Sequence, residues 1–236
     1  MQLFYSSQIG DSELRLVDDD HRHCSKVLRK KLRDSLIVTD GLGHKYEGAI
    51  KEISRNHTVV SIESKEHIER EYPRISIAIA PTKNMSRFEW FLEKATEIGI
   101  YSVQPILTKY SERKVLKTER CKKVLLSAMK QSQQFHLPIL HEMITWKEWM
   151  QSEFQGDKFI AFVDRENHPL VSLYEGKNEV LLLIGPEGDF SREEIDMAFA
   201  NGYRAVGLGR NRLRTETAGI VGVQILNGIL DKKNNS

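Results

Sequence analysis

Two turns near the C-terminal end of the chain hold the side chains whose types and spacing are best suited to chemistry. Residues 185–188 follow the apolar run 181–184, and residues 209–214 follow the apolar run 205–208. If both runs are strands of a parallel sheet, their carboxyl ends meet at one edge, where α/β folds bind small molecules. We therefore expect the segment 181–218 to form a ligand site.

The sequence LRTET at residues 213–217 adds a dense group of polar side chains. It places one guanidinium, two hydroxyls and one carboxylate at the expected start of a helix, where backbone N–H groups also point outward. Such a concentration favours a binding site over a plain connection. The turn GPEG at residues 185–188 is a weaker signal, because a turn of this kind is more often structural. The patterns GxxxxGKS/T and GxGxxG are absent, which excludes a P-loop for nucleoside triphosphates.

The elements that must position these groups lie beyond residue 73, where apolar and amphipathic segments alternate. This alternation is typical of a parallel sheet covered by helices on both faces. Thr145 with Glu148 and Ser191 with Glu194 are expected capping boxes, and Gly99 is an expected helix end. Strands are expected at residues 74–80, 100–107, 159–163, 180–184 and 203–208, and helices at 88–98, from Thr118, after Thr145, at 192–201 and at 217–230.

The last expected helix is apolar on nearly every side and contains Gly219, Gly222 and Gly228. Each glycine costs an isolated helix about 1 kcal/mol relative to alanine. We expect close packing against another backbone to compensate, either within the fold or across a dimer.

Residues 1–70 have a different pattern, with short strands typical of a small β-barrel. The strands are expected at residues 3–5, 36–39, 46–53 and 58–62, and Asp40 with Gly41 supplies a hairpin turn. A charged stretch at 66–73 ends in a proline and marks the boundary between a first domain, residues 1–70, and a second, residues 71–236.

A short helix is expected within residues 21–33, between the first two strands. In this helix His23, Val27 and Leu28 would share one face. His21 and His23 lack further ligands nearby, so we interpret them as structural or RNA-facing side chains rather than metal ligands.

The composition bounds the class of protein. The chain has 236 residues, 40% of them hydrophobic, and a formal net charge of +2, so it is expected to be an ordinary soluble globular protein. The charges are segregated, because residues 109–134 carry eight basic and two acidic side chains and residues 202–214 carry four arginines. This distribution suits a polyanionic partner, although a solvated helix face is the simpler reading of any one run.

Cysteine usage and hydropathy suggest the compartment. Cys24 and Cys121 are far apart and have no second cysteine nearby, so neither a disulfide framework nor a zinc site is expected. No segment resembles a signal peptide or a membrane span. We therefore expect a cytoplasmic protein that binds neither a metal nor a membrane.

The motifs IGPEGDFSREEI (residues 184–195) and LGRNRLRTETA (residues 208–218) closely resemble the signature of the RsmE-type family. This family methylates N3 of a uridine in small-subunit (16S) ribosomal RNA, using S-adenosylmethionine. Upstream, His23 with residues 27–29 resembles the family pattern H-x3-VLR, and Lys83 with residues 88–99 resembles its segment between domains. The resemblance covers nearly the whole chain.

The resemblance implies an α/β fold in which a small PUA-like β-barrel precedes a SPOUT-type, trefoil-knotted parallel sheet with helices on both faces. The knot would be a rare exception to the rule that chain connections stay unknotted. The family acts as a homodimer through the knot region, with S-adenosylmethionine in the knot loops. The residues implied to bind this cofactor are Ile184, Gly185, Glu187, Gly188, Leu208, Gly209, Leu213, Arg214, Thr217 and Ala218. Their types fit, because glycines admit close backbone approach and apolar side chains can cover a ring.

The chemistry of uracil suggests two catalytic candidates. N3 of uracil keeps its proton at neutral pH, so methylation requires its removal or a stabilised anion. We expect Arg214 to stabilise the uridylate and Glu216 to orient the base or accept its proton. The alternative is that both form a salt bridge that fixes the loop.

The expected RNA partner is small-subunit ribosomal RNA, within the assembled subunit, recognised by shape as well as by one base. Basic side chains would contact its phosphates and make binding sensitive to salt. The RNA-binding candidates are Arg29, Lys30, Arg33, Lys83, Arg87, Lys114, Arg210 and Arg212.

Four positions depart from the family pattern. Asp189 replaces a second glycine, Asn211 and Arg212 replace Arg-Ile, and Gln134 replaces an arginine. These departures concern the RNA contacts more than the cofactor site. Two other functions remain open, a catalytically inactive RNA-binding protein of this fold and a SPOUT enzyme that modifies another RNA or another atom.

Overall fold

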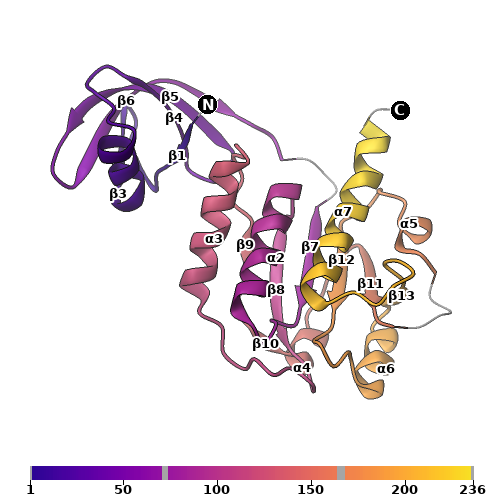
Figure 1. The fold of residues 1–236 in the computed structure, drawn as a ribbon. Coiled ribbons are helices and arrows are strands. Elements are labelled where there is room, and N and C mark those ends of the chain that lie inside the picture. The colour runs from indigo at the N-terminus through magenta and orange to yellow at the C-terminus, as the bar shows by residue number, and fades with distance from the viewer. Residues whose placement is uncertain (1, 71–73, 164–167, 235–236) are drawn as a thin grey trace. The chain divides into compact units, whose positions relative to one another are not determined.

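The computed structural model describes residues 2–70, 74–163 and 168–234 (Figure 1). Contacts divide the chain into two units. The first comprises Met1–Arg70 and Leu126–Leu137, and the second comprises Glu71–Leu125 and Pro138–Ser236. In the described part of the chain, none of the helices has the length and apolar character needed to cross a membrane.

The first unit is built on a six-stranded sheet with the order β1-β4-β5-β6-β3-β2. β1 and β4 pair in parallel, and the other neighbours pair antiparallel. The expected strands and the hairpin at Asp40 and Gly41 are confirmed, whereas β2 and β3 were not expected. The strands are β1 (Leu3–Tyr5), β2 (Gln8–Ile9), β3 (Glu13–Val17), β4 (Ser35–Thr39), β5 (His44–Ile53) and β6 (His57–His67).

The expected helix within residues 21–33 is wrong in its start and in its buried face. The chain forms α1 (Asp18–Arg22) and then a π-helix, η1 (His23–Val27). The π-helical bond, from the N–H of Leu28 to the carbonyl of His23 at 2.9 Å, adds one residue to the turn and so rotates the following side chains. Val27 and Leu28 are 62% and 40% exposed, and Cys24 is buried instead.

His21 is a structural histidine, which confirms one of the two readings offered for it. Its Nδ1 lies 2.9 Å from the hydroxyl of Thr58, and its Nε2 lies 3.2 Å from the carbonyl oxygen of Arg55. Both ring nitrogens of this buried side chain therefore have partners.

The second unit contains a parallel sheet with the order β10-β8-β7-β12-β11-β13, and β9 pairs with β8. This confirms the expected α/β class and all five expected strands, with ends shifted by a few residues. The two short strands that pair with β8, namely β9 and β10, were not expected. The strands are β7 (Ile75–Ile79), β8 (Ser102–Leu107), β9 (Ile139–Leu140), β10 (Ile144–Thr145), β11 (Asp157–Ala161), β12 (Val180–Ile184) and β13 (Arg204–Val206).

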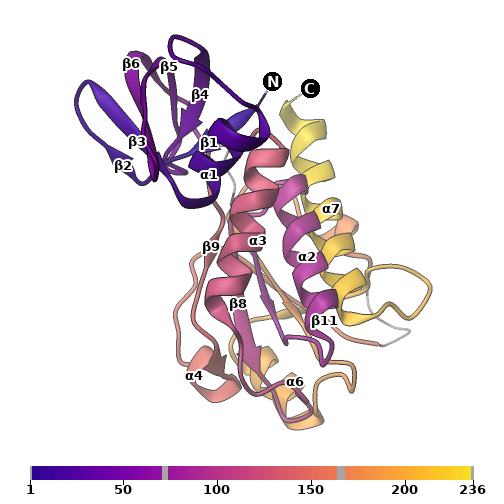
Figure 2. The same ribbon diagram turned by 60° about the vertical axis from the view of Figure 1, so that its left-hand side comes forward.

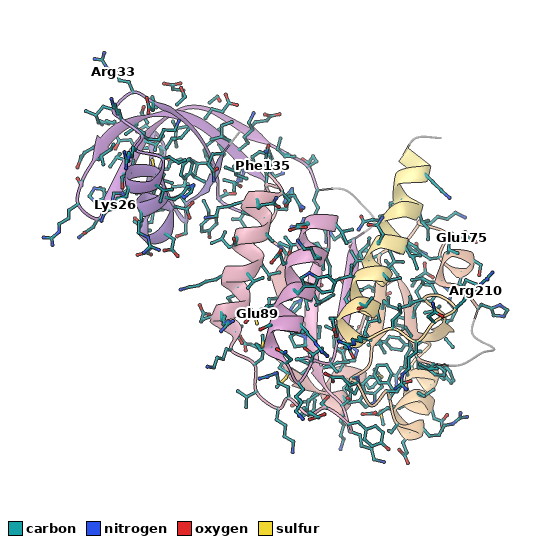
Figure 3. All side chains as sticks on the ribbon, in the orientation of Figure 1. Lys26, Arg33, Glu89, Phe135, Glu175 and Arg210 are labelled. Atoms are coloured by element: carbon teal, nitrogen blue, oxygen red, sulfur yellow. The ribbon has the colours of Figure 1, made fainter. Side chains whose placement is uncertain are left out.

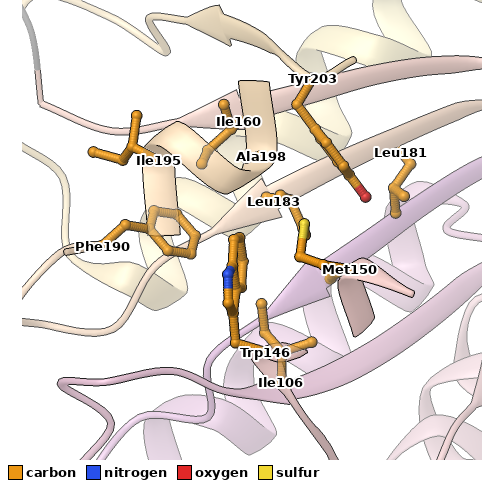
Figure 4. Close-up of a cluster of buried hydrophobic side chains, with 11 residues drawn as sticks. Ile106, Trp146, Met150, Ile160, Leu181, Leu183, Phe190, Ile195, Ala198 and Tyr203 are labelled. Carbon is orange, nitrogen blue, oxygen red and sulfur yellow. The ribbon is translucent and has the colours of Figure 1, made fainter. Parts of the chain in front are cut away.

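Helices cover both faces of this sheet. On one face, α4 and α6 bury Trp146 and Ile195 against Leu181 and Leu183 of β12 (Figure 4). On the other face, α2 and α7 lie side by side (Figures 1 and 2), and Leu182 points toward α7. The helices are α2 (Met85–Ile98), α3 (Thr118–Gln131), α4 (Trp146–Met150), α5 (Leu170–Leu173), α6 (Arg192–Ala200) and α7 (Thr215–Asn234).

The local helix signals are confirmed. Thr145 with Glu148 and Ser191 with Glu194 form complete capping boxes at the starts of α4 and α6. Gly99 ends α2 with φ of 112°, a left-handed conformation that glycine adopts without strain.

Two of the three glycines of α7 allow close packing, but against side chains rather than against another backbone. A Cβ on Gly219 would lie 2.6 Å from the Phe91 ring, and one on Gly222 would lie 2.4 Å from the Leu182 side chain. Among the described residues, a Cβ on Gly228 would meet no atom within 4 Å. The expected packing against a backbone is therefore wrong within the described fold, because the helix meets the protruding side chains of α2 and β12.

Candidate functional site

A cavity of about 870 Å³ lies at the carboxyl ends of β11, β12 and β13. Its size is in the range of pockets for small organic ligands. The two turns expected to form a ligand site both contribute to it. The lining residues are Ala161, Phe162, Val163, Pro169, Ile184, Gly185, Pro186, Glu187, Asp189, Val206, Gly207, Leu208, Gly209, Arg210, Asn211, Arg212, Leu213, Arg214, Thr215 and Ala218.

Eight of the ten predicted cofactor residues line this cavity. The other two do not line the cavity. A Cβ on Gly188 would lie 3.0 Å from the Cβ of Tyr110, so this glycine faces a protein side chain instead. Thr217 lies in the first turn of α7. The eight that line the cavity are Ile184, Gly185, Glu187, Leu208, Gly209, Leu213, Arg214 and Ala218.

The segment 161–163 forms a wall that the sequence motifs did not indicate. It begins at Ala161, the last residue of β11, and β11 lies between β12 and β13 in the sheet. The adjacency of β11 to both strands was the missing information, because strand order is not visible in a single sequence. The apolar run at residues 159–163 was recognised as a strand, but its end was not assigned to the site.

Glu187 joins three loops at the edge of the cavity. Its Oε1 accepts a hydrogen bond from the backbone N–H of Lys83 at 3.1 Å, and its carbonyl oxygen accepts one from Nη2 of Arg212 at 3.4 Å. Arg113 holds the same upstream loop through Nε, which donates to the carbonyl of Thr82 at 2.9 Å. The carboxylate of Glu187 therefore fixes the loop after β7 in place.

The two glycines of the motif turns have different surroundings. A Cβ on Gly185 would lie 3.1 Å from the ring of Phe190, so its small size admits a protein neighbour. Gly209 has φ of 150°, and no atom of the described residues lies within 4 Å of an added Cβ. Of these two, Gly209 is the position at which the backbone is open to a ligand.

Thr215 ties the beginning of α7 to the end of β12. Its hydroxyl donates a hydrogen bond to the carbonyl oxygen of Gly185 at 3.1 Å, and this contact is buried. Thr215 belongs to the LRTET sequence, within the segment 181–218 expected to form the ligand site, and it lines the cavity. It positions the residues on either side of it, Arg214 and Glu216.

The two catalytic candidates lie in different environments. Arg214 is exposed and lines the cavity. Glu216 is only 5% exposed and does not line it. Its Oε1 lies 3.7 Å from Nε of Arg87 on α2, and its Oε2 is buried with no hydrogen-bond partner among the described residues. The ion pair of Glu216 is thus with Arg87 rather than with Arg214.

The RNA-binding candidates occur in both units. Arg29 and Arg33 are exposed in the first unit with φ of 52° and 71°, and Arg33 points away from its sheet (Figure 3). In the second unit, Lys83 pairs with Glu112 at 2.7 Å, and Arg210 is exposed on the loop after β13. Lys30 is half-buried, Lys114 and Arg212 are exposed, and Arg87 is half-buried beside Glu216.

Comparison with known proteins identifies the family. Residues 69–227 match the RNA methyltransferase domain family, and residues 16–63 match the RNA methyltransferase PUA domain family. The first match covers more than half of the chain. The chain belongs to the RNA methyltransferase family.

Relatives of this RNA methyltransferase match it over nearly its whole length. "Ribosomal RNA small subunit methyltransferase E" of Rickettsia conorii is 25% identical over 229 residues, which are 94% of this chain and 93% of the relative. The crystal structure of a probable rRNA-methyltransferase from Porphyromonas gingivalis is 38% identical, with a TM-score of 0.93 and coverage of 99% and 100% of the two chains. A structure from Legionella pneumophila that holds the bound cofactor SAM is 25% identical, with a TM-score of 0.85 and coverage of 96% of each chain.

These comparisons confirm the resemblance to the RsmE-type RNA methyltransferases and the fold class it implies, a PUA-like unit followed by a SPOUT-type α/β unit. The trefoil knot itself stays a prediction of that resemblance. Among the described residues, no group of three or more His, Cys, Asp and Glu side chains could hold a metal ion.

Proposed function

We propose that the protein transfers a methyl group from S-adenosylmethionine to N3 of a uridine in small-subunit ribosomal RNA. The observation that carries this proposal is the cavity built from the two motif turns, in a chain of the RNA methyltransferase family. The curated relatives that share this architecture are small-subunit rRNA methyltransferases.

The residues of the cavity fit this cofactor. Ile184, Leu208 and Leu213 provide apolar surface for a purine ring, and the open backbone at Gly209 admits a ligand at close range. When bound, S-adenosylmethionine supplies a sulfonium methyl group that an electron-rich nitrogen can attack. We infer that the eight predicted residues that line the cavity hold it, whereas Gly188 faces Tyr110 and Thr217 lies in the first turn of α7, outside the lining.

Arg214 is the group best placed to act on the base. Loss of the N3 proton puts negative charge on the uracil oxygens, and a guanidinium at the cavity wall would stabilise that charge. Glu216, which is buried and does not line the cavity, would contribute indirectly. Its ion pair with Arg87 holds the start of α7 against the start of α2, and so positions the neighbouring Arg214. The proton acceptor would then be a group of the RNA or water near the cavity mouth.

Each of the two units carries basic side chains predicted to bind RNA. We infer that the eight RNA-binding candidates contact phosphates, so the affinity for a small-subunit rRNA fragment should fall steeply with salt. Arg33→Ala should lower the slope of log affinity against log salt by about one. Lys177→Ala is a matched control, because Lys177 is an exposed lysine outside the predicted set that pairs with Glu175. An affinity that barely changes with salt would contradict these phosphate contacts.

A homodimer through the knot region fits the surface of α7. Val221, Ile225 and Ile229 recur at helical spacing and are only half-buried within one chain. We infer that a second copy covers this stripe. Light scattering after size exclusion should give twice the mass of 27.2 kDa for the wild type and a monomer for Ile225→Glu. A monomeric wild type would contradict the dimer.

Because the proposed substrate is ribosomal RNA, we infer that the enzyme works in the cytoplasm.

The experiment that tests the proposed activity is methyl transfer from radiolabelled S-adenosylmethionine to small ribosomal subunits isolated from a strain lacking the gene. We expect label in 16S RNA. Subunits from the parent strain are the control and should accept little label, because their target uridine would already be methylated. Binding of RNA without any transfer would instead support a catalytically inactive RNA-binding protein.

A further inference from the structure

Asp189 occupies a backbone conformation that favours glycine. Its φ is 65°, in the left-handed region, and its backbone N–H donates to the carbonyl of Pro186 at 2.9 Å to close the turn after β12. A side chain in this conformation is strained, although aspartate and asparagine tolerate it better than other residues. The presence of a carboxylate here suggests that its contacts offset the strain.

The carboxylate of Asp189 makes two hydrogen bonds, and one of them crosses between strands. Oδ1 accepts from the backbone N–H of Phe190 at 2.8 Å, within the turn. Oδ2 accepts from the backbone N–H of Val163 at 3.1 Å, in the segment that leaves β11. Hydrogen bonds to a charged acceptor are stronger than those between neutral groups.

Both ends of the second hydrogen bond belong to the cavity wall. Val163 and its neighbour Phe162 line one side, and Asp189 lines the adjacent turn with Glu187. Phe162 is held by apolar contacts, because it packs against the core cluster and its ring lies 6.3 Å from that of Phe199. Val163 is 66% exposed, so little apolar burial holds this residue in place. The hydrogen bond to Asp189 therefore restrains the Val163 end of this side of the cavity.

We propose that Asp189 is a positioning residue for the cofactor. Its carboxylate holds the Phe162–Val163 segment against the turn at residues 185–189, and so keeps that side of the cavity closed around the ligand. This inference rests on the proposed function, because it assigns the cavity to S-adenosylmethionine. It adds a role for a side chain outside the predicted cofactor set.

Two substitutions separate the carboxylate from the backbone conformation. Asp189→Gly keeps the left-handed turn without strain and removes both acceptors. Asp189→Asn keeps the conformation and one carbonyl acceptor, while its amide group cannot accept the second N–H. Gln133→Gly is the matched control, because Gln133 also has a positive φ, of 57°, and does not line the cavity.

The readouts are calorimetric binding of S-adenosylmethionine, steady-state methyl transfer and amide hydrogen exchange of Val163. We expect the glycine variant to raise Kd and KM for the cofactor about tenfold, with kcat at saturating cofactor changed less than about twofold. The asparagine variant should fall between the wild type and the glycine variant. The amide of Val163 should exchange faster in Asp189→Gly, and the control should match the wild type.

Two results would overturn the proposal. One is cofactor affinity in Asp189→Gly within about twofold of the wild type. The other is weakened binding with unchanged exchange at Val163, which would mean that the carboxylate contacts the ligand directly. A wild type that binds no S-adenosylmethionine would instead refute the proposed function. In that case, amide exchange at Val163, compared without ligand between the wild type and Asp189→Gly, would still decide whether Asp189 restrains the segment.

Discussion

The hydroxyl of Thr215 donates a buried hydrogen bond to the carbonyl oxygen of Gly185 at 3.1 Å. The two residues are 30 positions apart in the chain; Gly185 opens the turn at residues 185–188, and Thr215 directly follows the turn at residues 209–214. This contact connects the end of β12 to the start of α7. Through it, the turn that carries Glu187 and the helix start that carries Arg214 become one site.

Replacing Thr215 with valine tests the strength of this connection. Valine has nearly the same shape but no hydroxyl, so the carbonyl of Gly185 would lose its buried donor. We expect the free energy of unfolding to fall by about 1–3 kcal/mol. Thr215→Ser, which keeps the donor, should lose less, and chemical denaturation measures both. A larger loss in Thr215→Ser than in Thr215→Val would show that the methyl group, not the hydrogen bond, is what stabilises this position.

The glycines of α7 predict opposite effects of the same substitution. Gly219→Ala should destabilise the fold by about 1–3 kcal/mol, because the added Cβ would lie 2.6 Å from the buried ring of Phe91. Gly228→Ala should stabilise it by up to about 1 kcal/mol, since that Cβ meets nothing within 4 Å and alanine favours helix. Thermal unfolding of both variants checks the pair. A more stable Gly219→Ala would contradict the packing of α7 on α2.

Arg214 and Glu216 should differ in their effect on the rate of methyl transfer. Arg214→Ala should lower kcat at saturating cofactor by about 100-fold, because it removes the group that stabilises the developing anion. Glu216→Gln keeps its shape and weakens only the ion pair with Arg87, so we expect a smaller loss.

Arg192→Ala is the control for this pair, since Arg192 is exposed on α6, pairs with Asp196 and does not line the cavity. Single-turnover rates with preformed complexes separate the chemical step from RNA binding. A near-normal rate in Arg214→Ala would refute its catalytic role.

His136 predicts loss of stability in mild acid. Burial lowers the pKa of His136 below its usual value, and the nearby Arg70 and His67 lower it further, although the carbonyl of Ile68 and the carboxylate of Asp40 oppose the shift. The folded state therefore binds this proton more weakly than the unfolded chain does. The unfolded histidine titrates near pH 6.5, so the free energy of unfolding should decrease as the pH falls through about that value.

Thermal unfolding at pH 7.5 and 5.5 tests the contribution of this histidine. His136→Asn should show a smaller drop in Tm between the two pH values than the wild type, whatever its stability at neutral pH. An identical drop would assign the acid sensitivity to other groups.

The features that the sequence predicted well are local ones. The strand at residues 180–184 matches β12 at both ends, and the capping boxes at Thr145 and Ser191 form as expected. Each depends on side chains within a few positions of one another. The π-helical turn after His23 was missed because a single additional residue per turn leaves no clear trace in the hydrophobic pattern.

The contacts that the sequence could not predict join distant segments. Glu216 pairs with Arg87 rather than with its neighbour Arg214, and the segment after β11 reaches the site through Asp189. Residues 126–137 belong to the first unit although they are more than 50 positions beyond its other residues. These partners are set by strand order and helix packing, which a single sequence does not reveal.

The most direct test of the proposed activity is mass analysis of nucleosides in 16S RNA from a strain that lacks the gene. The account predicts that 3-methyluridine disappears, that the wild-type gene restores it, and that the gene carrying Arg214→Ala does not. Unchanged 3-methyluridine in the deletion strain, or loss of a different modified nucleoside, would contradict the assignment to uridine N3.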